Sequence, residues 1–245
     1  MFRLDRIYRT NYVGESVTTQ ARFQDSEWSY ATEWVPTSVI NRQTSRVAAI
    51  IGNGLSRKDF ELYLLTKHMA GRLATGSMQT YGCNAVYRDA EPTFMIATGD
   101  EFCQEIVDSG YCDSHIVYAN ANKVMKYPGK FYLVPQDVPS NSGTIATYLA
   151  CFDGHEKIYL VGFDGWGGDN FHNNIYSDTA NYPAATQHIN DDYWVQSMIK
   201  VMETYSEVEF VRCMPTKAWR CPDAWLALPN FRQISYRDFV LEADL

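Results

Sequence analysis

The stretch Val47–Ser56, with the sequence VAAIIGNGLS, determines which fold this chain can adopt. Its continuous apolar run is typical of a strand buried on both faces, as in a parallel sheet covered by helices. Gly52-Asn53-Gly54 then predicts a tight turn, and Ser56 predicts the N-cap of a helix, with Asp59 completing a variant of the capping box. Such glycines let the backbone approach a ligand closely, and the first N–H groups of a helix attract phosphate. We therefore expect an α/β protein with an anion site near residue 53.

The composition narrows the class of protein. The net charge of −8 is opposite in sign to that expected of a nucleic-acid-binding protein, and an aromatic content of 14% suits a core together with the lining of a sugar or nucleotide pocket. The six cysteines have no CxxC spacing, which favours buried, reduced thiols. The apolar runs are shorter than a bilayer span, and charged residues near the N-terminus predict no secretory signal. We expect a cytoplasmic protein without a transmembrane segment, in which a peripheral membrane contact stays open.

The residue pattern divides the chain into three parts. Residues 1–46 are rich in Thr, Tyr, Val and Trp and predict a β-rich arm of two or three antiparallel strands. Residues 47–214 alternate strands with helices, which predicts a Rossmann-like nucleotide-binding α/β domain with a mainly parallel sheet flanked by helices. Within this domain the polar, aperiodic segment 165–190 predicts a lid. Residues 215–245 predict a tail that wraps the surface.

Polar residues follow several of the expected strands, where the ligand sites of α/β proteins are built. Asn84 ends the strand in YGCNAVY, and Asp164 follows the strand IYLV, although either side chain could simply close a turn. Ser142 and Gly143 open a helix, which makes a second candidate anion site. His188 lies near the end of the lid segment, shortly before the next expected helix, where a neutral imidazole could accept a proton. The G-N-G turn by itself matches neither the dinucleotide fingerprint nor a Walker loop.

The order of these motifs resembles the bacterial lipooligosaccharide sialyltransferases. That family shows GNG-x-S, C-N-x-x-Y, a Ser-Gly helix start and I-Y-L-x-G-x-D in the same order, followed by a lid and a histidine, and the similarity runs from about Val47 to Asn230. The wider superfamily that shares the Gly-x-Gly-x-Ser start includes proteins similar to 6-hydroxymethylpterin pyrophosphokinase. The resemblance implies a GT-A variant of the Rossmann-like fold and a transferase that uses a nucleotide-activated sugar.

The resemblance also implies a role for each matching position. His188 matches the family's general base, and Trp166 with Tyr176 or Tyr182 would stand for the two lid tyrosines that steady the leaving phosphate. No metal or cofactor is required by this chemistry, although Asp164 or the acidic residues of the lid could hold Mg²⁺. The positions expected to bind the nucleotide or the donor sugar are Gly52, Asn53, Gly54, Ser56, Asn84, Ser142, Gly143, Asp164, Trp166 and Tyr176.

The chain departs from the family at two places, which leaves its donor open. Leu55 replaces a proline of the first loop, and Pro139-Ser140-Asn141 stands where the family has an arginine that helps to hold an acidic sugar or its nucleotide. His172, also in the lid, is a rival base. Donor and acceptor, a glycan or another hydroxyl compound, are not specified by these residues, and the aromatic arm could support a homo-oligomer.

We expect a glycosyltransferase that inverts the anomeric carbon by direct displacement, with His188 as the base. Three alternatives stay open at this point. The first is a Mg²⁺-dependent phosphotransferase similar to the pterin pyrophosphokinases. The second is a glycosyltransferase that acts on modified DNA bases, for which the basic residues Arg212, Lys217, Arg220, Arg232 and Arg237 would supply the positive charge. The third is a nucleotide-binding protein without catalysis.

Overall fold

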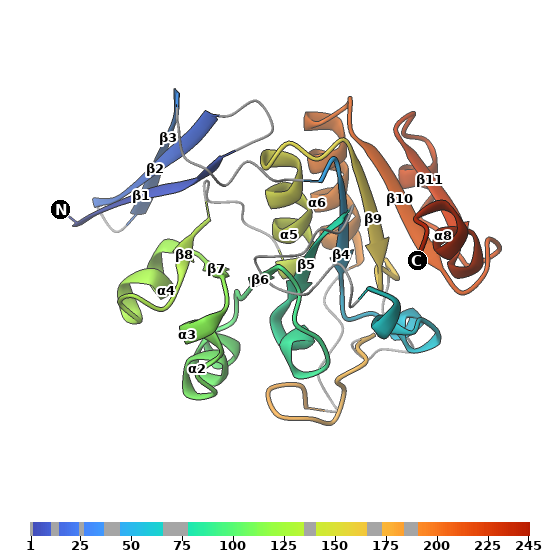
Figure 1. The fold of residues 1–245 in the computed structure, drawn as a ribbon, viewed down its shortest axis with the longest axis horizontal. Coiled ribbons are helices and arrows are strands. Elements are labelled where there is room, and N and C mark those ends of the chain that lie inside the picture. The colour runs from blue at the N-terminus through green and yellow to red at the C-terminus, as the bar shows by residue number, and fades with distance from the viewer. Residues whose placement is uncertain are drawn as a thin grey trace.

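Eight parallel strands form the central sheet, in a computed structural model that describes residues 2–10, 15–24, 27–36, 45–65, 78–134, 141–165, 173–183 and 191–245 (Figure 1). The strands are β4 (Val47–Ile51), β5 (Met78–Cys83), β6 (Phe94–Ile96), β7 (Val117–Ala119), β8 (Tyr132–Leu133), β9 (Lys157–Val161), β10 (Glu209–Met214) and β11 (Phe231–Ser235). Their order in the sheet is β11-β10-β9-β4-β5-β6-β7-β8. The expected Rossmann-like α/β fold with a parallel sheet is confirmed.

The chain enters the sheet at its centre and fills it in two directions. After β4 it adds β5 to β8 on one side, and it then returns to place β9 on the other side of β4. The gap between the carboxyl ends of β4 and β9 is therefore the switch point of the topology, where open α/β sheets bind their ligands.

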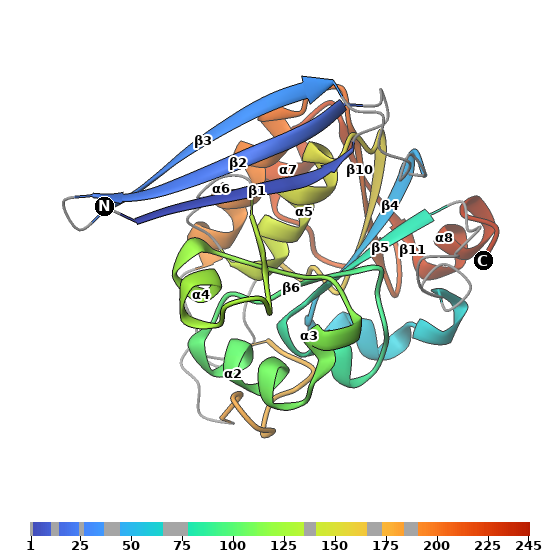
Figure 2. The ribbon, with the colours of Figure 1, turned by 60° about the vertical axis from the view of Figure 1, so that its left-hand side comes forward.

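Helices cover both faces of this sheet (Figures 1 and 2). They are α2 (Asp100–Asp108), α3 (Tyr111–Ser114), α4 (Ala121–Lys126), α5 (Ser142–Phe152), α6 (Asp191–Thr204), α7 (Asp223–Leu226) and α8 (Tyr236–Glu242), with the 3₁₀ helices η1 (Leu55–Asp59), η2 (Leu62–Leu65) and η4 (Asn84–Arg88). Ala48 and Ile50 of β4 pack with α5 and α6, whereas Ala49 and Ile51 pack with α2 and α8. Because both sides of β4 are buried, the strand reads as an unbroken apolar run.

The two ends of the chain add strands in different ways. The arm is the expected antiparallel meander, with β1 (Phe2–Thr10), β2 (Glu15–Gln24) and β3 (Glu27–Pro36), and β1 contacts β8 of the central sheet. The C-terminal residues, expected to wrap the surface, instead supply β11, which pairs in parallel with β10 from Phe210↔Phe231 to Met214↔Ser235. Among the described residues, no helix combines the length and the apolar character needed to cross a bilayer.

Candidate functional site

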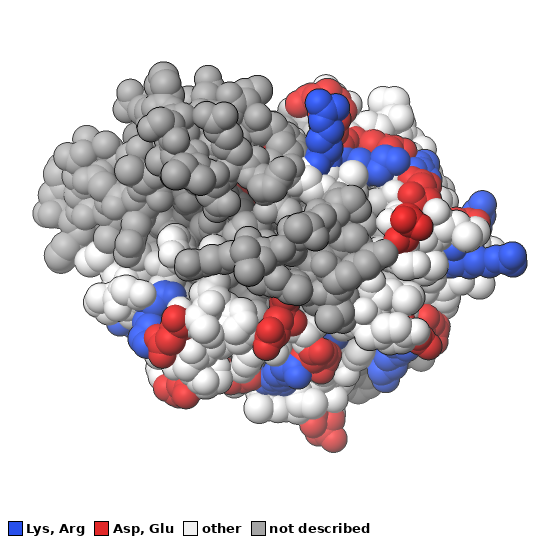
Figure 3. Space-filling view, viewed as in Figure 1, with Lys and Arg blue, Asp and Glu red and all other residues white. Residues whose placement is uncertain are grey.

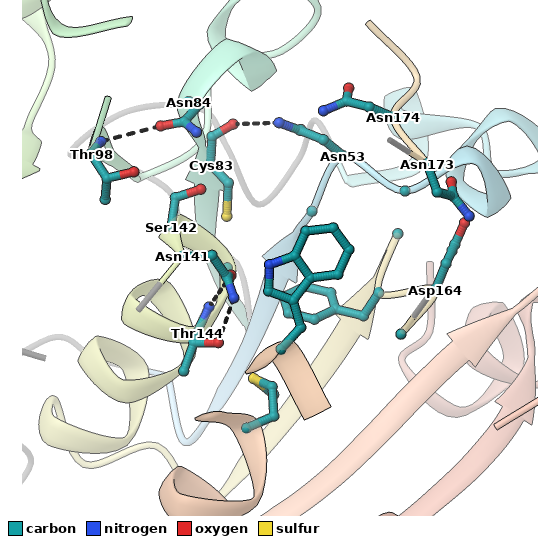
Figure 4. Close-up of a pocket in the computed structure, with 18 of the residues that line it drawn as sticks. Asn53, Cys83, Asn84, Thr98, Asn141, Ser142, Thr144, Asp164, Asn173 and Asn174 are labelled. Atoms are coloured by element: carbon teal, nitrogen blue, oxygen red, sulfur yellow. Dashed lines mark hydrogen bonds between the residues drawn. The ribbon is translucent and has the colours of Figure 1, made fainter. Parts of the chain in front are cut away.

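A cavity of about 360 Å³ opens at the switch point of the sheet. Its walls come from the turn after β4, the turn after β9, the first turn of α5, and the described part of the lid, Asn173–Tyr182. In Figure 4, Asn84, Asn53, Asn174 and Asn173 lie along one rim, and Ser142 and Asn141 lie below its Asn84 end, on the side opposite Asp164. A cavity of this size suits a small organic ligand.

The structure brings most of the predicted positions together. Ser56 and Tyr176 do not line the cavity, so the expectation that they contact a donor does not match their placement. Trp166, His188 and the rival His172 lie outside the described residues. The predicted positions that do line the cavity are Gly52, Asn53, Gly54, Asn84, Ser142, Gly143 and Asp164.

The turns after β4 and β9 approach each other so closely that glycine is required. The amide of Gly52 donates to the carbonyl of Val161 at 2.8 Å, and the amide of Gly54 donates to the carbonyl of Gly162 at 2.9 Å. A Cβ on Gly52 would lie 2.6 Å from the carbonyl oxygen of Gly162. Gly162 itself has φ of +74°, in the left-handed region. The glycines of the motif thus join two strands at the floor of the site.

The predicted anion site at the G-N-G turn is not formed as expected. The segment after it is the five-residue 3₁₀ helix η1, in which Ser56 is an internal, buried residue and not the N-cap. The amide of Leu55 donates to Asn173 Oδ1 at 2.8 Å, and the amide of Ser56 donates to Asp164 Oδ2 at 3.1 Å. The Ser56 hydroxyl also donates to Asp164. These N–H groups are therefore satisfied by side chains of the protein, and the capping box with Asp59 is wrong because Ser56 lies inside η1 and its hydroxyl donates to Asp164.

Asp164 connects the turn after β9 to Ser56 of η1 and to Arg212. Its carboxylate is committed to Ser56, and its carbonyl accepts from Nη2 of Arg212 at 2.6 Å. Nε of Arg212 donates to the carbonyl of Phe163 at 2.6 Å, and its guanidinium lies over the ring of Trp225 at 5.7 Å. Burial lowers the pKa of Arg212. Arg212 thus fixes the turn after β9 by hydrogen bonds to two successive carbonyls.

The first turn of α5 is the part of the cavity wall whose backbone N–H groups are free to bind a ligand. Asn141 caps the helix, because its Oδ1 accepts from the Thr144 amide at 3.0 Å. Ser142 and Gly143 therefore occupy the first two helical positions, whose N–H groups have no partner within a helix. No acceptor for these two amides is seen in the part of the chain that the structure describes. The prediction that residues 142 and 143 open a helix at the site is confirmed.

Asn84 connects two strand ends at the rim. It follows β5 with φ of 47°, a left-handed conformation that asparagine tolerates better than most residues. Its Oδ1 accepts from the Thr98 amide at 3.2 Å, which ties the end of β5 to the segment after β6. Asn84 therefore acts as a turn residue and also lines the cavity.

Two arginines attach the described part of the lid to the body of the protein. Arg57, which is buried, donates to Asp89 at 2.9 Å and to the hydroxyl of Tyr176 at 2.7 Å. Arg88 donates to Thr179 and to the carbonyl of Ala180, each at 2.9 Å. Tyr176 is therefore an anchor of the lid, and its hydroxyl is turned to Arg57 and Asp89.

Sequence reasoning missed several residues of the wall. Asn141 carries a visible signal, since asparagine before Ser-Gly-Thr is a favoured N-cap. Tyr182, considered only as a substitute tyrosine, accepts a hydrogen bond from Asn53 Nδ2 at 3.1 Å. The aromatic members of the wall have no local signal, because their side chains arrive from distant elements. These members are Phe102, Phe163, Trp194 and Trp225.

Three of the five basic residues named near the C-terminus are buried or paired with carboxylates, whereas Arg220 and Arg237 are exposed. Arg212 is buried, Arg232 is paired with Glu209 and Glu242, and Lys217 is paired with Asp238. On the face seen in Figure 3, acidic and basic side chains of the described residues are interspersed. The described residues contain no group of three or more His, Cys, Asp or Glu side chains arranged to hold a metal ion.

Comparison with protein-family models, with curated proteins and with solved structures finds no match to this chain.

Proposed function

We propose that this chain is a glycosyltransferase that moves a sugar from a nucleotide-sugar donor to an acceptor hydroxyl. The observation that supports the proposal most is the cavity at the switch point, where the carboxyl ends of β4, β5 and β9 and the first turn of α5 share one wall. The motif order described above supplies the reaction class.

The first turn of α5 would receive the phosphate of the nucleotide. The amides of Ser142 and Gly143 would donate to phosphate oxygens, helped by the positive end of the helix dipole. The acceptor oxygen would attack the anomeric carbon while His188 takes its proton. The bond from that carbon to the phosphate oxygen would break, and its electron pair would leave with the nucleotide. Tyr182, whose hydroxyl lies at the rim, would donate to the departing phosphate.

The proposed phosphate site can be tested without disturbing the helix. In Ser142→Pro the first helical amide is lost, but proline is favoured at this position and the extended Asn141, with φ −75° and ψ 162°, accommodates it. Ser142→Ala removes the hydroxyl alone and serves as the matched control. By calorimetry with CMP, UDP, GDP and their sugars, we expect Ser142→Pro to bind about 10-fold to 100-fold more weakly than Ser142→Ala. Equal binding by both variants would contradict a phosphate at this helix.

The role of His188 requires a separate measurement. We expect His188→Ala to bind the donor like the unchanged protein but to lose transfer by about 100-fold or more, as measured by nucleotide release in the presence of acceptor. His115→Ala, which changes a histidine outside the cavity wall, is the control and should retain transfer. Undiminished transfer by His188→Ala rules out His188 as the base. Pyrophosphoryl transfer that strictly requires Mg²⁺ would support the phosphotransferase instead.

A further inference from the structure

The amide side chains around the cavity have fixed orientations. The Oδ1 atoms of Asn84, Asn173 and Asn174 each accept from a backbone N–H group, at 3.2, 2.8 and 2.9 Å, on Thr98, Leu55 and Tyr176 respectively (Figure 4 shows the first of these). A backbone N–H cannot be satisfied by the NH₂ end of a carboxamide, so none of the three can be flipped. Each must therefore present its NH₂ group, a hydrogen-bond donor, away from the backbone.

The NH₂ groups of Asn84 and Asn174 converge, together with that of Asn53, on the hydroxyl of Tyr182. Burial raises the pKa of Tyr182, and hydrogen bonds from Asn174, Asn84 and Asn53 to its hydroxyl act in the opposite direction. The amide nitrogen of Asn173 meets no acceptor in the described part of the chain. This side of the cavity thus offers uncharged donors, each with N–H capacity to spare for a ligand.

The rest of the wall suits a compact polyhydroxyl compound. The hydroxyls of Thr98 and Ser142 can donate or accept, and the rings of Phe102, Phe163 and Trp225 give apolar surface. The charge on the described wall comes from the carboxylate of Asp164. A second carboxylate, brought in by a ligand, would be desolvated beside it with uncharged donors as its partners, which is costly.

We propose that the group transferred from the donor is an uncharged sugar, whose hydroxyls accept hydrogen bonds from Asn84, Asn173 and Asn174. The proposal rests on the function proposed above and specifies its substrate class. Hydroxyl oxygens match fixed NH₂ donors without the need for a counter-charge, whereas the carboxylate of an acidic sugar would find no cation in the described wall, where Asp164 is the charged residue.

The test compares UDP-glucose with UDP-glucuronate, which differ only in whether carbon 6 is a hydroxymethyl group or a carboxylate, and with UDP alone. GDP-mannose with GDP, and CMP-N-acetylneuraminate with CMP, extend the comparison to other bases. By calorimetry we expect the neutral sugar to bind at least tenfold more tightly than its nucleotide and at least tenfold more tightly than the acidic sugar. An acidic sugar that binds as tightly as the neutral one overturns the proposal.

A pair of matched variants tests the donor side of the cavity. Asn173→Asp keeps an oxygen for the Leu55 amide but replaces the NH₂ donor by a charged acceptor, and we expect tenfold or greater weakening of UDP-glucose binding with UDP binding changed less than twofold. Asn120→Asp adds the same charge outside the cavity wall and keeps the cap of α4, since its Oδ1 accepts from the Lys123 amide at 3.3 Å, and it should leave the binding of UDP-glucose and of UDP unchanged.

The outcomes separate this proposal from the function on which it rests. Wild-type affinity of Asn173→Asp for UDP-glucose overturns the assignment of the sugar side. Nucleotides that bind while their sugars add nothing overturn it as well but leave the nucleotide site in place. If no nucleotide binds at all, the glycosyltransferase proposal fails together with this one.

Discussion

Gly162 is the residue at which the geometry of the site is most constrained. Its φ of +74° disfavours any side chain, and a Cβ there would lie 2.8 Å from the carbonyl oxygen of Gly52. We expect Gly162→Ala to lower the free energy of unfolding by about 1–2 kcal/mol for the backbone conformation and by about 1–3 kcal/mol more for the clash with backbone. Urea unfolding followed by circular dichroism measures this loss.

Gly129 provides the matched control for this prediction. It has a similar φ of +81°, but a Cβ there would meet no atom within 4 Å. Gly129→Ala should therefore show the conformational cost alone, about 1–2 kcal/mol, and should leave ligand binding unchanged. Equal losses in the two variants would mean that the close approach of β4 and β9 does not matter for stability.

Serine at a helix start shows that a local sequence pattern alone does not decide a capping box. The pattern Ser-x-x-Asp occurs at Ser56 and again at Ser235, and only Ser235 with Asp238 forms a capping box, at the start of α8. The hydroxyl of Ser56 instead donates a hydrogen bond to Asp164, which lies 108 positions away in the chain. The two tetrapeptides look alike, and the tertiary partner decides between them.

At the scale of elements, one ion cluster connects β9, β10, β11 and α8. Glu242 accepts from Arg232, Lys157 and Tyr159, and the hydrogen bond from Arg232 is the main reason that its pKa falls to about 2. A carboxyl group whose pKa is lower in the folded than in the unfolded chain stabilises the fold above its unfolded pKa, and this contribution is lost as the pH falls toward 2. The cluster therefore holds the C-terminal elements on the sheet at neutral pH.

We expect Glu242→Gln to lose about 1 kcal/mol of unfolding free energy at pH 7, since the pairs are partly exposed to solvent. The difference from the unchanged protein should stay constant above about pH 5 and shrink as the pH is lowered from 4.5 toward 2. Urea titrations across this range measure it. Glu203→Gln, an exposed change on α6, is the control, and a gap that widened in acid would refute the assignment.

The elements differ in how far the sequence predicts them. Buried strands such as β4 and β9 were predicted from unbroken apolar runs, because both of their faces are covered. β11 was not, since FRQIS carries polar residues that an edge strand can expose. Its place in the sheet follows from pairing with β10 and not from its own composition.

At the scale of the whole molecule, the reactivity of the cysteines measures how well the interior is shielded from solvent. All six are free, four are buried, and burial raises the pKa of each thiol, to about 12 for Cys83 and Cys103 and to about 11 for Cys112. The thiolate is the reactive form, so at pH 8 even Cys112 should react about a hundredfold more slowly than an ordinary thiol.

A disulfide exchange reagent tests this directly. At pH 8 we expect the folded protein to react slowly at every cysteine, with Cys112 and Cys221 first because they are only partly buried, and all six to react rapidly in urea. Removal of the partly buried pair by Cys112→Ala and Cys221→Ala should abolish the early reaction. Modification of any thiol in the folded protein at the rate seen in urea would contradict this packing.

The sequence was sufficient for the fold class and for four polar members of the cavity wall, Asn53, Asn84, Ser142 and Asp164, because these positions sit at strand ends and helix starts that have local signals. Asn173 and Asn174 of the lid, and Thr98 after β6, were not predicted. The aromatic wall and the orientation of the amide groups were beyond its reach. Trp225 and Tyr182 reach the cavity only when α7 and the lid segment fold against the sheet. Their contribution depends on contacts between segments far apart in the chain.

Arg212 binds acceptors that come both before and after it in the chain, so the order in which the chain is synthesised affects when these bonds can form. The same guanidinium that holds the carbonyls of Phe163 and Asp164 also donates to the carbonyl of Arg220 and to the side chain of Gln233. A nascent chain on the ribosome can therefore pair most of its strands while half of these acceptors are still untranslated. A premature stop codon shortly before Gln233 would leave every described residue of the cavity wall translated but would remove β11, α8 and one of the four acceptors of Arg212, so the turn after β9 would be held less firmly.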